Sequence, residues 1–128
     1  MGRIVTNVTI KNIMEPQTVL SCDALVDTGA AYMVLPKEWK SRLGKLNLIR
    51  MVDCETATQK LIKGEVCGPV EIQIEGFEPL YGEVMFLEME PQDGQFEPLV
   101  GYIILEQSQA AVDMLGHRLV RVRKTDLK

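Results

Sequence analysis

The sequence predicts a mainly β fold with one main short helix, contained in a single domain that spans residues 1–128. Three observations support this prediction. The chain has 46% hydrophobic and 25% charged residues, a composition typical of globular domains. Its 13 Val, 9 Ile and 7 Thr fall mostly in short runs between Gly, Pro or acidic residues, which favours strands over long helices. No stretch is rich enough in Pro, Gly or Ser to separate two domains.

The first elements follow from the apolar runs and the breaks between them. Residues 4–10 and 18–26 lie on either side of the turn-prone segment 14–17, which predicts a β-hairpin. Residues 34–36 resume an extended apolar run. The segment 36–44 begins with Pro and ends with Gly, the arrangement favoured at the start and just past the end of a helix. We therefore expect one or two helical turns there.

The rest of the chain is predicted in the same way. Short apolar or alternating runs indicate strands over residues 48–54, 60–66, 70–74, 83–87 and 119–123. Residues 102–111 contain the strong helix formers Leu, Glu, Gln and Ala, and they form the predicted main helix. The segment 88–98 has the composition of an acidic surface loop.

The most informative stretch is Ala-Leu-Val-Asp-Thr-Gly-Ala-Ala at residues 24–31, where an apolar strand runs into polar residues. A carboxyl group at the end of a buried strand costs free energy unless something uses it. Asp27, Thr28 and Gly29 are also ordinary turn residues, so a capped turn after a strand is the structural alternative.

This stretch resembles the active-site signature of the retropepsin-like aspartic proteases, in which two apolar residues precede Asp-Thr-Gly and an extended strand follows. Pro-Leu-Val-Gly at residues 98–101, followed by the predicted helix, resembles the second signature of that family. Residues 111–120 resemble the strand, turn and strand that end many of its single-domain members. Over residues 6–122 the resemblance implies a closed acid-protease β-barrel subunit that works as a homodimer.

The resemblance also implies a role for each signature residue. The family mechanism needs two carboxyl groups that share one proton, one acting as general base for a water and one as acid toward the carbonyl. Because this short chain has one Asp-Thr-Gly, the two groups would be Asp27 of two subunits at a two-fold axis. Thr28 would hydrogen-bond across the dimer, and Gly29 would offer its N–H to the carboxylate. Ala30, expected among the substrate-binding residues, stands where pepsin-like relatives usually carry Ser.

The flap, the hairpin that closes over substrate in this family, would come from residues 53–64. Thr56, Ala57 and Thr58 would lie near its tip and contact the substrate. The local sequence Glu-Thr-Ala-Thr-Gln at residues 55–59 departs from the Ala-Asp-Gly-like turn of many bacterial members.

The leading functional prediction is an aspartic endopeptidase that binds an extended peptide or protein substrate across the dimer cleft and hydrolyses it with an activated water. One alternative keeps the fold and the cleft but is a catalytically weak or inactive peptide-binding dimer. A second alternative is an unrelated small β-barrel binding module in which Asp-Thr-Gly occurs by accident. The conspicuous residues Trp39, Asp113 and His117 are expected to pack or to lie in surface turns.

Composition excludes several other classes of function. Fourteen Lys and Arg against eighteen Asp and Glu give a net charge of −4, which offers no general attraction to nucleic acid or to an anionic membrane. No stretch approaches the roughly 20 apolar residues of a membrane span, and the first residues lack the apolar core of a secretory signal. The three cysteines have no CxxC spacing and one histidine to join them, so neither a disulfide framework nor a structural metal site is supported. No cofactor is expected. We expect reduced thiols and a cytoplasmic protein.

Overall fold

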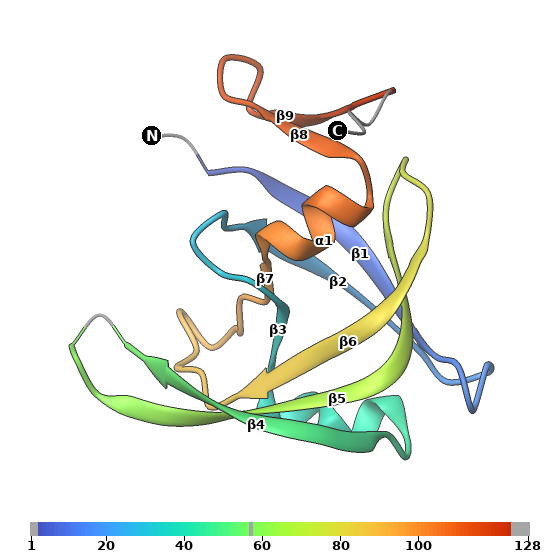
Figure 1. Cartoon of the computed structure of the whole chain (residues 1–128). Helices are drawn as coiled ribbons and strands as arrows, with labels where there is room; N and C mark the ends of the chain where they lie inside the picture. Colours follow the sequence, from blue (N-terminus) through green and yellow to red (C-terminus); the bar gives the residue numbers. More distant parts are fainter. Residues whose placement is uncertain (1–2, 57, 124–128) are drawn as a thin grey trace, which may run out of the picture.

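The computed structural model describes residues 3–56 and 58–123, which form a mainly β fold with one short α-helix (Figure 1). This confirms the fold class predicted from the sequence. The elements in chain order are β1 (Val5–Asn12), β2 (Val19–Val26), β3 (Met33–Pro36), the 3-10 helix η1 (Lys37–Leu43), β4 (Asn47–Glu55), β5 (Leu61–Ile74), β6 (Leu80–Leu87), β7 (Leu99–Val100), α1 (Tyr102–Gln107), β8 (Ala110–Asp113) and β9 (Arg118–Arg121).

Six strands close into a barrel, as predicted. The main sheet has the order β1-β2-β7-β3-β6-β5-β4, and a further pairing between β1 and β5 joins the two ends of its first six members. This closing ladder is antiparallel and runs from Val8 opposite Ile74 to Asn12 opposite Val70. Closure removes the free edges that an open sheet would expose. Of the seven strands of this sheet, β4 lies outside the ring and pairs with β5, and β8 and β9 form a separate two-stranded sheet.

The barrel encloses the main hydrophobic core. Strand residues point alternately inward and outward, and the fully buried side chains include Val8, Ile10, Leu35, Ile72 and Phe86. A second, smaller cluster of Val34, Val66 and Met85 lies on the opposite face of β3, β5 and β6. Because β3 is covered on both faces, all four of its residues are buried.

One predicted break between strands is wrong. Residues 60–66 and 70–74 belong to one continuous strand, β5, whose pairing with β6 shifts register between Cys67 and Val70. Gly68 and Pro69 stand between the two runs. In the structure β6 pairs with both runs, so the ladder continues past this irregularity.

The predicted end of the main helix is also wrong, because the helix covers Tyr102–Gln107 and not residues 102–111. Gln109 adopts a positive φ of 56°, and the chain then enters β8, which pairs antiparallel with β9. The helix propensity of Ala110 and Ala111 is therefore overridden by strand pairing.

Several smaller predictions are confirmed. Pro36 precedes η1, and Gly44 follows it with a φ of 69°. Trp39 packs against the main core and meets the ring of Phe96 edge-on at 6.3 Å between centroids. Exposed His117 lies in the turn between β8 and β9.

The three cysteines are free thiols: Cys67 is buried, and Cys22 and Cys54 are half-buried. Within residues 3–56 and 58–123, no helix is long and apolar enough to cross a bilayer. Over the same residues, no three His, Cys, Asp or Glu side chains gather as a metal site would require.

Candidate active site

Asp27 lies where β2 ends and the chain turns out of the barrel wall. The last two residues of β2, Leu25 and Val26, pair in parallel with Leu99 and Val100 of β7. The N–H of Asp27 then donates to the carbonyl oxygen of Val100 at 3.0 Å. The backbone that carries the Asp27 carboxyl group is thus fixed by the neighbouring strand.

Strand β7 crosses the loop that carries Asp27. It pairs with β2 on one side and with β3 on the other, so residues 27–32, called the Asp27 loop below, connect the two strands that flank it. The two signature-like segments singled out in the sequence, residues 24–31 and 98–101, therefore pack directly against each other. Figure 1 shows β7 and α1 beside this loop.

Gly101, which follows β7, permits this close packing. A Cβ atom at Gly101 would lie 2.5 Å from the carbonyl carbon of Ala31 and from the carbonyl oxygen of Tyr32. Real Cβ atoms do not approach backbone atoms so closely, so a larger residue would push the Asp27 loop away. The first N–H groups of a helix have no partner within it, and here the N–H groups of Tyr102 and Ile103 donate to the carbonyls of Ala30 (2.8 Å) and Ala31 (3.1 Å).

The Asp27 carboxylate is oriented by its own loop. The N–H of Gly29 donates to Oδ1 of Asp27 at 2.9 Å, and the N–H of Ala30 donates to the Asp27 carbonyl oxygen at 3.1 Å. The first of these bonds is the one that the family resemblance implies, and it also occurs in ordinary Asx turns. Thr28 is exposed, and among the described residues its hydroxyl group has no hydrogen-bond partner.

Asp27 and Thr28 open onto a hollow of about 400 Å³ whose other walls are largely apolar, with Ile4, Val112 and Met114 among them. Beside it, the turn after β8 leaves Met114 52% and Leu115 96% exposed. The carboxyl group therefore lies next to an open apolar surface. Surfaces of this kind typically mark interaction sites.

The predicted hairpin over residues 53–64 is present. Its strands pair from Asp53 opposite Lys63 to Glu55 opposite Leu61. The pairing of β5 with β6 ends at Glu65, so the hairpin beyond it is a two-stranded ribbon. Its described residues, 52–56 and 58–64, are called the arm below and extend beyond the barrel. Figure 1 shows this ribbon reaching outward from β5 and β4.

Thr56 and Thr58, two of the residues predicted at the tip of the flap, lie at the tip of the arm. The Thr56 and Thr58 hydroxyl groups are 3.0 Å apart, whereas Ala57 lies outside the described residues. Thr56 and Thr58 line a hollow of about 330 Å³ with Glu88 and Glu90. The structure thus brings Asp27, Thr28, Gly29 and Ala30 together in one loop and places the two threonines in a different hollow.

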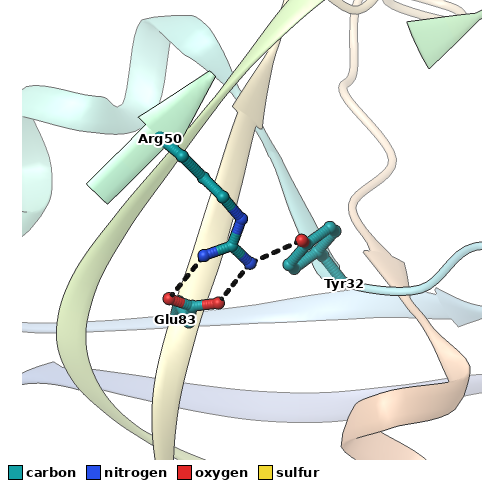
Figure 2. A network of polar contacts seen from close by, with 3 residues as sticks. All are labelled: Tyr32, Arg50 and Glu83. Carbon is teal, nitrogen blue, oxygen red and sulfur yellow. Dashed lines mark hydrogen bonds and ion pairs between the residues drawn. The ribbon is translucent and has the colours of Figure 1, made fainter. Parts of the chain in front are cut away.

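A polar network at the end of the Asp27 loop was not predicted from the sequence (Figure 2). The Arg50 guanidinium donates to Glu83 Oε1 at 2.7 Å and Oε2 at 3.4 Å, and to the Tyr32 hydroxyl oxygen at 2.6 Å. These bonds, Glu83 first and then Tyr32, raise the pKa of Arg50. The network depends on the parallel pairing of β3 with β6, which places Met33 opposite Val84. Local sequence patterns give no signal of that pairing.

No known family profile matches this sequence, and no curated protein does. Among solved structures, the fold is similar to that of the EIAV protease in complex with the inhibitor HBY-793. The TM-score is 0.58 with 19% sequence identity, and the match covers 83% of this chain and 88% of that chain. The similarity shows that this chain has a retropepsin-like fold.

Proposed function

We propose that this chain is an aspartic endopeptidase that acts as a homodimer and hydrolyses peptide bonds with a water held between two Asp27 carboxyl groups. The observation that supports the proposal most strongly is the setting of Asp27. It follows a barrel strand, sits on a loop crossed by β7, and has one carboxylate oxygen held by the N–H of Gly29 at 2.9 Å. This setting occurs in a chain with the fold of a retroviral protease.

The chemistry requires a second carboxyl group near the first. One carboxylate cannot both remove a proton from water and present a proton to the carbonyl oxygen, whereas two adjacent carboxyl groups retain one shared proton. Among the described residues that line the hollow beside Asp27, Asp27 is the one acid. A second copy of the chain, related by a two-fold axis, would supply the other.

The face around Asp27 suits such a partner. Thr28, Met114 and Leu115 are exposed there, beside an apolar hollow. In a two-fold dimer each subunit uses the same patch. The exposed apolar side chains of one subunit can therefore cover the apolar hollow of the other. We place the dimer interface on this face, with the turn between β8 and β9 as part of it.

In the proposed reaction, the ionised Asp27 takes a proton from the water while the water oxygen attacks the peptide carbonyl carbon. The protonated Asp27 of the other subunit gives its proton to the carbonyl oxygen, which produces a tetrahedral diol. As the C–N bond of the diol breaks, the carboxyl group that took a proton from the water gives it to the leaving nitrogen, and the other carboxylate takes a proton from a diol hydroxyl group. The products are a carboxylic acid and an amine, and the pair of carboxyl groups again holds one proton.

One observation supports the alternative of a peptide-binding dimer without turnover. The described part of the arm tip lies in a hollow with Glu88 and Glu90 and not in the hollow of Asp27. If the arm does not close over the two carboxyl groups, they stay open to water. A bound peptide would then be poorly positioned for attack. The fold similarity argues against the second alternative, an unrelated β-barrel.

Digestion of a peptide library at several pH values, with products identified by mass spectrometry, tests the proposal. We expect cleavage by the wild type and none by Asp27→Asn, because an amide can neither accept the proton from water nor share one. The matched control is Asp23→Asn, which removes an exposed acid from β2 and should leave cleavage unchanged. Undiminished cleavage by Asp27→Asn would overturn the proposal. An inactive wild type that still dimerises and binds peptides would favour the alternative.

A further inference from the structure

We propose that Tyr32, Arg50 and Glu83 form a clamp that fixes the root of the arm to the Asp27 loop, which makes Arg50 and Tyr32 positioning residues. The clamp itself is a property of the fold. Its effect on catalysis rests on the proposed function.

The first argument is the position of Arg50 in the sheet. On β4, Arg50 lies opposite Val66 of β5, and Val66 lies opposite Met85 of β6. The next residue of β5 toward the arm, Glu65, is the last that pairs with β6. Arg50 is therefore located at the level where the hairpin separates from the barrel. A two-stranded ribbon by itself is only marginally stable, so the direction of the arm depends on its contacts with the barrel. These include the packing of Val52 and Cys54 against the cluster around Met85 as well as the polar contacts at its root.

The second argument is the reach of the side chain. In the sheet order β3-β6-β5-β4, the Arg50 side chain spans from β4 across β5 to Glu83 on β6 and to Tyr32 just before β3. Figure 2 shows the guanidinium between the carboxylate and the phenol, with dashed lines to both carboxylate oxygens of Glu83 and to the hydroxyl oxygen of Tyr32. The planar fork of an arginine can serve both partners at once, which a lysine ammonium with a shorter reach cannot do in the same geometry.

The third argument is the position of Tyr32 within the Asp27 loop. The preceding carbonyl groups, those of Ala30 and Ala31, are held by the first N–H groups of α1. Tyr32 adds a side-chain attachment at the same end of the loop, at 2.6 Å from Arg50. The Arg50 side chain thus connects the loop that carries Asp27 to the root of the arm that would cover substrate.

The clamp acts through geometry more than through stability. The side chains of Arg50 and Glu83 are 44% and 31% exposed, and ion pairs with such exposure contribute little to the free energy of folding. A second ion pair, Lys40 to Glu65 at 3.1 Å, attaches the other strand of the arm root to η1. That pair does not reach the Asp27 loop. Among the described residues, the clamp at Arg50 is thus the one connection through charged or hydroxyl groups between the Asp27 loop and the root of the arm.

Hydrogen exchange of the backbone amides tests the clamp without any need for activity. Tyr32→Phe removes one hydroxyl group and keeps the ring, and Arg50→Met removes the charge. We expect both variants to exchange roughly two- to fivefold faster than wild type in residues 27–32 and 47–55, the effect of losing a weak surface tie. The control, Lys63→Met, breaks the Lys63–Asp53 ion pair within the arm (2.6 Å) and should leave exchange in residues 27–32 unchanged.

Unchanged exchange in residues 27–32 of both Tyr32→Phe and Arg50→Met would overturn the clamp, whatever the activity of the wild type. If the wild type cleaves peptides, Tyr32→Phe should raise KM roughly two- to fivefold with kcat and the pH profile unchanged, because the carboxyl pair is untouched. A fall in kcat with KM unchanged would contradict the positioning role. A wild type that cleaves no peptide would refute the proposed function and leave the exchange result to decide the clamp.

Discussion

Replacing Gly101 by Ala should disrupt the packing that holds the Asp27 loop in place. The added Cβ atom would lie 2.5 Å from the Ala31 carbonyl carbon and the Tyr32 carbonyl oxygen, and 2.6 Å from the Ala30 carbonyl oxygen. All three are backbone atoms, which cannot rotate away as a flexible side chain could. Relief of the clash therefore requires the Asp27 loop and the start of α1 to move apart.

The expected loss of stability has two sources. Overpacking of a well-packed site typically costs about 1–3 kcal/mol. Moving the loop also weakens the hydrogen bonds from Tyr102 and Ile103 to the loop carbonyls, each worth about 1 kcal/mol. We therefore expect Gly101→Ala to lower the free energy of unfolding by about 3–5 kcal/mol, a large part of the roughly 5–15 kcal/mol of a typical domain.

Urea unfolding followed by the fluorescence of the single tryptophan, Trp39, measures this loss at a fixed protein concentration. The matched control is Gly82→Ala on β6, where the nearest atom to an added Cβ would be Leu80 Cδ1 at 3.6 Å, an ordinary contact. That variant should stay within about 0.5 kcal/mol of wild type. A Gly101→Ala protein as stable as the Gly82→Ala control would refute the packing argument.

Three further predictions concern the interface, a thiol and a turn. Leu115→Glu should weaken the proposed dimer roughly tenfold or more in sedimentation equilibrium, since it removes an apolar side chain that is 96% exposed in the single chain; an unchanged dissociation constant would exclude this turn from the interface. Burial raises the pKa of the Cys22 thiol from 9.0 to about 11, so alkylation of Cys22 at pH 8 should be about a hundredfold slower in the native than in the unfolded protein, and equal rates would contradict this. Hydrogen bonds to the Asp113 carboxylate, the one from the Gly116 N–H first among them, lower its pKa below 3.8. The carboxylate therefore contributes to the stability of the fold above pH 3.8, and this contribution is lost as the pH falls through the lowered pKa. The stability difference between wild type and Asp113→Asn in thermal unfolding should accordingly shrink at acid pH, and a constant difference would argue against it.

Local patterns were sufficient to predict most of the strands and the position of Asp27 at the end of one of them. The run of apolar residues into Asp27, the turn after residue 12 and the Pro and Gly around η1 each depend on neighbours in the sequence. The end of the main helix was predicted wrongly for the opposite reason. Ala110 and Ala111 favour a helix by themselves, but they form a strand because they pair with β9.

The parts of the site that escaped prediction depend on contacts between distant strands. Arg50 and Glu83 are 33 residues apart and meet because β6 lies between β3 and β5. The need for glycine at position 101 arises from the approach of the Asp27 loop, some 70 residues earlier. The position of the arm tip in a separate hollow from Asp27 likewise depends on where the hairpin leaves the barrel.

The activity of mixed dimers tests most directly whether two chains share one catalytic site. Wild-type and Asp27→Asn chains are unfolded together in equal amounts, refolded at a fixed total concentration, and assayed on a cleaved peptide. If each site needs an Asp27 from both subunits, only wild-type pairs are active, and the rate should fall to about one quarter of that of the wild type. A rate of about one half, as expected when each chain is a complete enzyme, would contradict the shared pair of carboxyl groups.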